Sequence, residues 1–559
     1  MSEVFAQSIS PSESAAQEIN RQQERERVLR QQQELAPDVR LQGRETGESL
    51  GKLPTGEIPC FPIQHIELNG DTSERFQWAL LLANRASDDT PDIAIGRCLG
   101  TGGISLVMKR IQNAIIQRGF VTTRVLAQPQ DLGSGTLVLT LVPGRVHSVR
   151  FTEDSSQRAT QWNAVPVRRG DLLNLRDIEQ GLENFKRIPT AEADIQITPA
   201  EGGDAKPGDS DLVIAWKQSF PVRVSLSADN TGTKSSGKYR GNATISGDHF
   251  LALNDLLYVS FNHGLGGGNT GARGTRGYTA HYSLPWGYWL LGFSSSYYNF
   301  HQEVAGYSQN YLYSGDSLSN ELKLSRVVYR DAKRKTSMFV SGWQHSYNNF
   351  IDDTEIEVQR RRMIGWDAGV EHHAYIGDAV LDVNADYRHG TGAFSALPAP
   401  EELTGDGTSR PSIFGASAQL NLPFAFGGHR WRFTGSFRGQ WTRTALVPQD
   451  RFSIGGLYTV RGFDGENTLL ADSGWLLRND LGLALGGSGQ ELYLGLDYGS
   501  VNGPSSRYLI GTDLCGAVLG LRGSAKGVSY DLSWGVPLSK PTGFQTASST
   551  VGFSMSVSF

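Results

Sequence analysis

The chain carries few of the residue patterns with which proteins carry out covalent chemistry. It has neither the H-E-x-x-H pattern of a zinc hydrolase nor the G-x-S-x-G elbow of a serine hydrolase. Its adjacent histidines, His372 and His373, fall in a strand-like segment, where neighbours point to opposite faces and cannot easily chelate one metal. The glycine-rich stretch 264–269 has no helix after it, and no phosphate loop of the form G-x-x-x-x-G-K-[ST] occurs. We therefore expect no enzyme, no catalytic residue, no metal site and no cofactor.

The sharpest chemical feature is a possible ion pair between Arg461 and Asp497. In the strand-like segment 492–499, Asp497 falls on the face opposite to the leucines. Arg461 lies in a glycine-rich loop between segments that end near Trp441 and begin near Trp475. Folded inward, this loop could bring the guanidinium to the carboxylate in a bidentate contact, which suits Arg better than Lys. From the residues alone, the alternative is two unrelated charges that both face water.

The segments that would position this pair belong to a long β-rich region, residues 218–559. Segments of about ten residues alternate apolar with polar or small side chains, most clearly in 379–388, 431–441 and 551–559. A soluble sandwich is one interpretation. Charges and small residues on one face, with aromatic residues at segment ends on the other, favour a transmembrane antiparallel β-barrel with a wet lumen. About sixteen strands would use roughly 21 residues each, which allows for long outer loops.

Residues 57–217 predict two small α/β modules, 57–143 and 144–217. The first is expected to contain strands at 66–68, 120–126 and 136–142, with helical segments at 73–82 and 104–115. The second is expected to contain strands at 149–151, 193–198 and 211–216, and a helix capped by Asn174 that carries Leu175, Ile178 and Leu182. Each module is small but long enough to fold.

Residues 1–36 are polar and contain strong helix formers from Gln17 to Glu34, after a capping-box pair of Ser14 and Gln17. Such a helix is roughly 30 Å long, close to the thickness of a bilayer core, yet it is far too polar to face lipid. It must lie in water or in a wet lumen, so the choice is between a lumen helix and a disordered leader. Residues 37–56 predict a flexible linker.

Composition excludes several classes of protein. The chain has 559 residues with 52 Lys and Arg against 57 Asp and Glu, a net charge of -5, which does not suit a nucleic-acid binder. No apolar run approaches the roughly 20 residues of a membrane-spanning helix. The N-terminus shows no basic stretch followed by an apolar one, so we expect a chain whose secretion signal has been removed or replaced.

Several separate motifs together resemble one family, and the resemblance runs from about residue 57 to the C-terminus. The sequence is similar to two-partner secretion outer-membrane transporters of the filamentous-haemagglutinin, haemolysin and contact-dependent-inhibition type. The motifs are Cys60-Phe61-Pro62-Ile63, Gly119-Phe120-Val121-Thr122-Thr123-Arg124, Gln128-Pro129-Gln130-Asp131-Leu132, Leu173-Asn174-Leu175-Arg176-Asp177-Ile178, Val460-Arg461-Gly462-Phe463 and Gly495-Leu496-Asp497-Tyr498-Gly499.

The resemblance implies a 16-stranded outer-membrane barrel, two periplasmic polypeptide-transport-associated (POTRA) domains and a helix, within residues 1–36, that plugs the lumen. It assigns Val460, Arg461, Gly462 and Phe463 to the tip of a long sixth loop, about 443–474, and Asp497 to the barrel wall that meets it. It implies export of one large exoprotein, recognised through its N-terminal secretion domain, as an extended chain without ATP. A contact-dependent growth inhibition toxin is slightly favoured over an adhesin or haemolysin.

Other expectations depend on the same resemblance. The chain is expected to be a monomer that contacts lipid and lipopolysaccharide and is inserted by the barrel-assembly machinery, with Phe559 as its C-terminal signal. Because the exported compartment is oxidising, Cys60 and Cys98 are expected to pair, with three free thiols as the alternative. A barrel-assembly factor of the same superfamily is the rival function, and a diffusion porin would not need the periplasmic modules.

The periplasmic modules are the expected receptors, because an exposed strand edge beside a helix can bind an extended segment. The groove near Leu175, Ile178 and Leu182 is the expected site, although these residues suit a plain hydrophobic core equally well.

Overall fold

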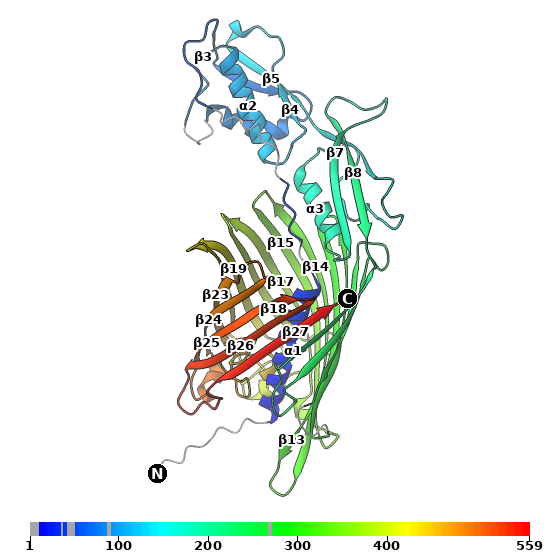
Figure 1. Cartoon of the computed structure of the whole chain (residues 1–559), viewed down its shortest axis with the longest axis vertical. Coiled ribbons are helices and arrows are strands. Elements are labelled where there is room, and N and C mark those ends of the chain that lie inside the picture. The colour runs from blue at the N-terminus through cyan, green and yellow to red at the C-terminus, as the bar shows by residue number, and fades with distance from the viewer. Residues whose placement is uncertain (1–10, 35–36, 42–50, 86–90, 267–270) are drawn as a thin grey trace.

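The computed structural model describes residues 11–34, 37–41, 51–85, 91–266 and 271–559 (Figure 1). Two small domains stand in line beyond one end of a tilted barrel, and a helix lies inside the barrel (Figure 1). Parts of the expected plug segment and linker (residues 1–10, 35–36 and 42–50), and the end of the glycine-rich stretch 264–269, lie outside the described residues.

The described residues of the C-terminal region form a closed barrel of sixteen antiparallel strands, as predicted. Each strand pairs with the next along the chain, and β27 pairs with β9 to close the sheet. A two-residue strand, β16 (Thr354–Glu355), adds to β15 beside β17. The sixteen are β9 (Val222–Asp229), β10 (Arg240–Asp248), β11 (Leu256–Gly264), β12 (Arg273–Trp286), β13 (Trp289–Ala305), β14 (Asn310–Arg330), β15 (Arg334–Ile351), β17 (Arg361–Ile376), β18 (Ala379–Thr391), β19 (Ser412–Phe426), β20 (His429–Thr442), β23 (Ser473–Ala484), β24 (Gln490–Asn502), β25 (Asp513–Ala525), β26 (Val528–Ser539) and β27 (Thr550–Ser558).

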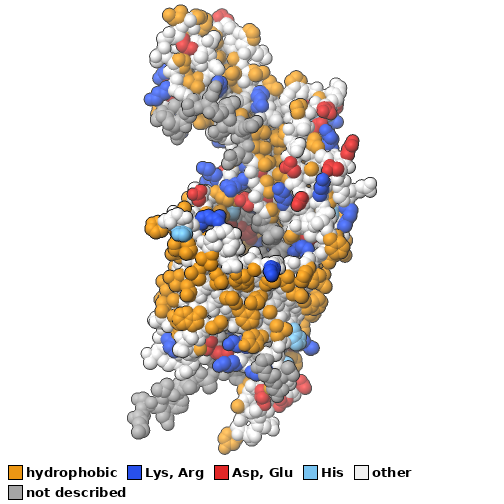
Figure 2. Space-filling model, in the orientation of Figure 1, with side chains coloured by type: hydrophobic (Ala, Val, Ile, Leu, Met, Phe, Trp, Pro, Cys, Tyr) orange, Lys and Arg blue, Asp and Glu red, His pale blue; other side chains and the backbone are white. Residues whose placement is uncertain are grey.

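The outside of the barrel is apolar. Figure 2 shows hydrophobic side chains gathered in a band around it, with most charged side chains above and below. Exposed tryptophans contribute to this surface: Trp286, Trp289, Trp366, Trp441 and Trp534. Since closure leaves no free sheet edge, the strands satisfy their backbone groups within the sheet, as a lipid environment requires.

The first small domain has a three-stranded sheet in the order β2-β5-β4, covered by two helical elements. The elements of this domain are β1 (Phe61–Pro62), β2 (His65–Asn69), η1 (Ser73–Asn84), β3 (Cys98–Leu99), α2 (Thr101–Gln117), β4 (Arg124–Leu126), η2 (Leu132–Ser134) and β5 (Thr136–Val142). The strand predicted at 120–126 is shorter, because the Gln112 amide bonds Thr123 O and Val125 N, each at 2.7 Å, where a ladder would begin.

The second small domain has a three-stranded sheet in the order β6-β8-β7, with one helix packed on it. Its elements are β6 (Arg145–Phe151), α3 (Leu175–Lys186), β7 (Ala191–Pro199) and β8 (Asp209–Gln218). The Asn174 side chain caps α3 by accepting a hydrogen bond from Arg176 N at 2.8 Å, as the sequence predicts.

The N-terminal helix α1 (Pro11–Gln33) lies within the barrel (Figure 1). It begins earlier than the capping-box pair predicts. Ser14 is inside the helix, and its hydroxyl exchanges hydrogen bonds with Gln302 of β13 instead of capping the backbone. Among the described residues, no helix combines the length and the apolar character needed to cross a membrane.

Two further strands sit in the loop between β20 and β23. They are β21 (Phe452–Ile454) and β22 (Leu469–Ala471), which pair as a short antiparallel hairpin. The loop is therefore a folded unit that can carry a motif to a fixed place.

Candidate functional site

The long loop between β20 and β23 turns into the barrel and packs on its inner wall. Val460 and Phe463, on either side of Arg461-Gly462, are fully buried in a cluster with residues of β21, β22, β24 and β25. Phe463 meets Phe544 edge to face, with ring centroids 5.9 Å apart. This apolar seat holds the tip of the loop against the wall.

Arg461 and Asp497 form the contact that the sequence suggests. The guanidinium Nε lies 2.7 Å from Asp497 Oδ2, and Nη2 lies 2.7 Å from Oδ1. The Arg461 backbone N–H also donates to Oδ2 at 2.9 Å. Asp497 is fully buried and Arg461 is 5% exposed, so the ion pair lies between the loop and the barrel wall with almost no access to solvent. The alternative expected from the residues alone, two unrelated charges that both face water, is therefore wrong.

A second carboxylate, which sequence analysis missed, shares the same guanidinium. Arg461 Nη2 lies 2.5 Å from Asp480 Oδ1 on β23, and Asp480 in turn pairs with Arg522 at 3.1 Å. Arg522 continues the chain of charges to Glu491 at 2.6 Å. Asp480 has the opposite parity to Leu477, Leu481 and Leu483 of its strand, as Asp497 has to the leucines of β24, and that parity was the available signal.

The glycine of the motif allows the loop to approach the wall this closely. Gly462 has φ +97°, which favours glycine, and a Cβ on it would lie 2.5 Å from Val536 O. A Cβ on Gly516 of β25 would lie 1.9 Å from Arg461 O. Side chains at either position would push the loop off the wall.

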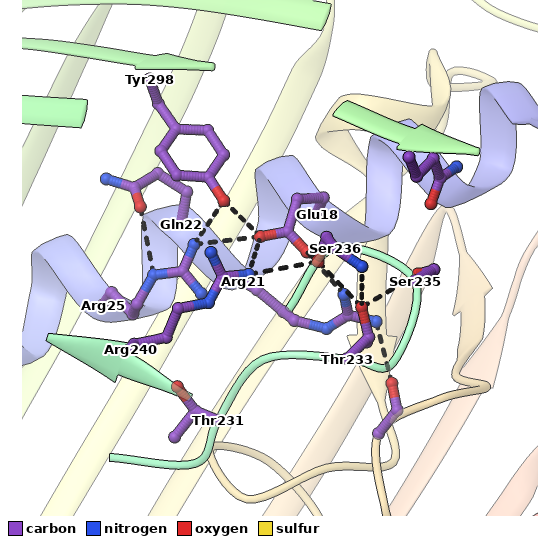
Figure 3. Close-up of polar contacts among 12 residues, drawn as sticks. Glu18, Arg21, Gln22, Arg25, Thr231, Thr233, Ser235, Ser236, Arg240 and Tyr298 are labelled. Atoms are coloured by element: carbon purple, nitrogen blue, oxygen red, sulfur yellow. Dashed lines mark hydrogen bonds and ion pairs between the residues drawn. The ribbon is translucent and has the colours of Figure 1, made fainter. Parts of the chain in front are cut away.

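A buried cluster around Glu18 fastens α1 to the barrel (Figure 3). Glu18 pairs with Arg21 at 2.8 Å, with Arg25 at 3.2 Å and with Arg240 of β10 at 2.9 Å. It also accepts hydrogen bonds from Ser236, at 2.9 Å, and from Tyr298 of β13. The carboxylate is 2% exposed, so one side chain of the helix joins two parts of the wall.

Further contacts extend along the helix. Glu24 pairs with Arg438 of β20, and Arg30 pairs with Glu321 of β14 at 3.0 Å. Arg21 Nη2 donates to Gly465 O of the long loop at 2.8 Å. The helix therefore bridges separate parts of the wall and the loop by polar contacts, which hold it inside the lumen as a plug.

The remaining sequence-predicted residues lie away from the lumen. Leu175, Ile178 and Leu182 are at most 5% exposed and belong to the core of the second small domain, so they line no open groove. Cys60 and Cys98 form a disulfide with Cα atoms 5.2 Å apart. Cys515 is a free thiol in β25.

The C-terminal Phe559 is 75% exposed at the edge of the closing strand pair. Its backbone exchanges two hydrogen bonds with Val224, at 2.9 and 3.2 Å. The described residues contain no group of His, Cys, Asp or Glu arranged to hold a metal ion.

One histidine of the second small domain sits between two carboxylates. His147 Nδ1 lies 2.9 Å from Asp211 and its Nε2 lies 3.2 Å from Asp204. The hydrogen bonds to Asp211 and then Asp204 raise the pKa of His147 above its usual value.

A sixteen-stranded barrel with a lumen helix, an inward loop and two small α/β domains defines an outer-membrane transporter with periplasmic POTRA domains. The protein-family model described as "Haemolysin secretion/activation protein ShlB/FhaC/HecB" matches residues 208–523 of this chain. POTRA models match residues 61–144 (ShlB-type) and 145–199.

Relatives agree with this assignment. The outer membrane transporter CdiB-2 of Burkholderia pseudomallei is 36% identical, over 98% of this chain and 94% of the relative. The solved structure of CdiB from Acinetobacter baumannii, at 30% identity, covers the whole of both chains with a TM-score of 0.84. CdiB from Escherichia coli covers 99% of both, at 25% identity and a TM-score of 0.85. The chain belongs to the haemolysin secretion/activation family of two-partner secretion transporters, which are not enzymes.

Proposed function

We propose that this chain recognises one dedicated large exoprotein through its POTRA domains and exports it, unfolded, through the barrel lumen without ATP. The observation that supports this is the polar plug: the lumen binds a whole helix through ion pairs and hydrogen bonds, so its wall suits a hydrated polypeptide. The sequence has no phosphate loop with which to use a nucleotide. Folding or binding of the partner outside the cell would drive transport.

The partner is proposed to be a contact-dependent growth inhibition toxin. The relative named CdiB-2 is 36% identical over nearly the whole chain, whereas the hemolysin transporter HpmB of Proteus mirabilis is 25% identical over 77% of it. An adhesin or haemolysin partner is the alternative within the same function.

The Arg461 contact is proposed to anchor the long loop during transport. Three hydrogen bonds join Arg461 to Asp497, and a fourth joins it to Asp480. The loop also touches the plug through Gly465, so its position affects the path that an exported chain would follow.

The apolar outer surface of the barrel supports a proposal about its membrane environment and its insertion. We propose a monomer that contacts outer-membrane lipid and lipopolysaccharide through the apolar band, and that is inserted by the barrel-assembly machinery with Phe559 as its signal. The closed sheet and the exposed Phe559 support this. Removing Phe559 should lower insertion into outer membranes.

The function is tested in liposomes that contain only this protein. The probe is the purified, unfolded N-terminal domain of the large exoprotein encoded beside the gene, and the readout is its protection from added protease. We expect protection without ATP, and none in empty liposomes. Strict dependence on ATP would refute export by this mechanism. Insertion of other barrel proteins, with no protection of the probe, would favour the assembly-factor alternative.

A further inference from the structure

The apolar band of the barrel (Figure 2) reaches the second POTRA domain at the periplasmic end of β12. Trp286, the last residue of β12, is 62% exposed and shares the outward face of that strand with Tyr278 and Leu284. Trp162, in the loop of the second domain between β6 and α3, is 59% exposed. The two indole rings meet edge to face, with centroids 5.5 Å apart. An aromatic pair therefore joins the lipid-facing wall to the domain.

The loop that carries Trp162 is fixed to the barrel on both sides of the indole. Thr160 Oγ1 donates to Ala252 O at 2.6 Å, and Asn163 Nδ2 donates to Leu253 O at 2.6 Å. The three residues that follow Trp162 are buried. The exposed indole is thus held outward by an ordered loop, and it does not belong to a free end of the domain.

The turn between β10 and β11, to which this loop binds, adds two apolar side chains to the same surface. Phe250 is 59% exposed and Leu251 is 57% exposed. A Cβ on Gly247 would lie 3.4 Å from the Phe250 ring. Gly247 shares the outward face of β10 with the exposed Ile245. Phe250 therefore lies against the outer wall of the barrel and extends its apolar surface toward the periplasm.

The same turn is strained and tightly held. His249, Ala252 and Asn254 have φ values of 56°, 58° and 55°, which residues with a Cβ rarely adopt. The Asp255 carboxylate accepts a hydrogen bond from Leu251 N at 3.1 Å, and His249 Nδ1 accepts one from Asn254 N at 2.9 Å. Left-handed residues persist where the surrounding contacts determine them. The turn therefore presents its two apolar side chains in a fixed place.

A neighbouring pair marks the level of the lipid headgroups. Trp289, the first residue of β13, is 42% exposed, and Arg326 of β14 lies over its ring, with Cζ 4.9 Å from the centroid. Tryptophan prefers the interface between membrane and water, and a long cationic side chain reaches from there toward the headgroups. Trp286 pairs directly with Trp289 across the turn, so Trp286 and its neighbour Trp162 lie at the same level.

We propose that Trp162, Phe250, Leu251 and Trp286 form a lipid-anchoring patch, which inserts among the phospholipids of the periplasmic leaflet of the outer membrane. The patch continues a surface that already faces lipid, and its aromatic composition is that of a membrane interface. The second POTRA domain is then held by the bilayer as well as by the barrel. This inference goes beyond export, because it concerns the place of the domain relative to the membrane.

The first experiment identifies what covers the patch. The photoreactive residue p-benzoyl-phenylalanine replaces Trp162 in the full-length protein, which is irradiated in the outer membranes of intact cells. We expect an adduct heavier by one glycerophospholipid, detected by mass spectrometry of the purified protein. Replacement of Trp289 on the lipid-facing wall is the positive control. Replacement of Leu81 is the matched negative control, because Leu81 is apolar and 73% exposed but lies on the first domain.

Three outcomes of this experiment would overturn the proposal. One is lipid adducts at position 289 but none at position 162. Another is an adduct at position 162 whose main component is a protein, such as the exported chain. The third is lipid adducts of equal yield at positions 81 and 162, which would show contact without a defined patch.

The second experiment measures depth in vesicles of phosphatidylethanolamine and phosphatidylglycerol. The full-length variants Trp162→Cys and Leu251→Cys carry a nitroxide spin label in a Cys515→Ser background, in which Cys60 and Cys98 remain disulfide-bonded. Both labels should be more accessible to oxygen, which concentrates in the bilayer, than to a water-soluble nickel chelate. A label at Leu81→Cys should show the reverse order. Labels at 162 and 251 that behave like the label at 81 would contradict the anchoring.

The third experiment removes the lipid contact with little change to the folded structure, because the Leu251 side chain is more than half exposed. Leu251→Asp places a charge in the patch, so the loop 156–165 should open more often in these vesicles, and its amide exchange should rise at least about tenfold. Leu81→Asp should leave that exchange unchanged. Equal exchange in Leu251→Asp and the wild type would show that lipid does not hold the domain.

Discussion

The ion cluster around Glu18 predicts how firmly the plug is docked. Substituting Glu18→Ala removes the one carboxylate that Arg21, Arg25 and Arg240 share. The arginines then remain close together in a buried place. Among the described residues, Arg240 Nε and Nη1 and Arg25 Nη1 already make no hydrogen bond, so other acceptors are scarce.

The expected magnitude follows from this burial. Breaking a buried ion pair by removing one partner costs about 3–5 kcal/mol. We take the low end, about 3 kcal/mol, because lumen water can hydrate the arginines once the helix moves. This free energy is lost from the docking of α1 and not from the stability of the barrel, because the barrel keeps its backbone pairing. At about 1.4 kcal/mol for each tenfold change, the undocked fraction should rise about a hundredfold until it saturates.

Single-channel recording in planar bilayers measures the undocked fraction of α1 as the share of time that the channel spends in its large-conductance state. Deleting residues 1–36 gives the fully open reference. Arg27→Ala is the matched control, since Arg27 lies on the same helix, pairs with Glu24 at 3.1 Å and is 46% exposed. An exposed pair contributes at most about 1 kcal/mol, so this control should open no more than about fivefold.

The result that would refute the reasoning is an open time for Glu18→Ala no greater than that of Arg27→Ala. In that case the other contacts of the helix would hold it without the cluster. A deletion of residues 1–36 that leaves conductance unchanged would go further and show that α1 does not limit flow through the lumen.

Three further predictions concern other contacts. Arg461→Ala removes the partner of two carboxylates, so it should reduce secretion more than Asp497→Ala, which leaves the Asp480 contact, while both proteins keep heat-modifiable migration on gels. The raised pKa of His147 means that protonated His147 stabilises the second small domain. This stabilisation is complete below a pH of about 6.5 and is lost as the pH rises through the raised pKa, so the protection of amides in β6 and β8 against exchange should fall over that range. Replacing Cys60 and Cys98 by Ser, which opens a loop with a sequence separation of 38, should destabilise the first domain by about 3–4 kcal/mol, measured by denaturant unfolding.

Each of these has a contradicting outcome. Normal secretion by Arg461→Ala would mean that the apolar seat of Val460 and Phe463 suffices to hold the loop. Exchange rates in β6 whose pH dependence is the same in His147→Gln would assign it to another group. Equal stability of the oxidised and the double-Ser protein would show that the disulfide closes a loop already ordered in the unfolded chain.

Much of the fold could be predicted because it rests on local periodicity. Alternation in segments such as 431–441 identifies barrel strands, and a run of helix formers after Ser14 identifies α1. Boundaries were less predictable where side chains compete with the backbone. The Gln112 amide shortens β4, and Ser14 bonds Gln302 instead of capping its helix.

The functional contacts also differ in how far they can be predicted from the sequence. The Arg461 and Asp497 contact could be inferred from residue type, parity and family resemblance, but Asp480 joins it from a different strand, and no local pattern predicts that strands β23 and β24 place both carboxylates beside one guanidinium. The same holds for Arg330 of β14, which pairs with Glu179 and Glu183 of α3 although it lies far from them in sequence. Long-range charge networks depend on the closed barrel itself.

The polar character of the plug contacts has a consequence for transport. A buried ion pair often contributes little more to stability than a well-packed apolar contact would, because desolvation offsets attraction. It does fix position, since each charge is costly to leave unpaired. The lumen contacts therefore set the place of α1 without making its release as costly as unpacking a hydrophobic core. Arg21 ties the plug to Gly465 of the loop, and Arg330 ties the linker to α3. Movement of the loop would therefore act on the plug through the Arg21 contact.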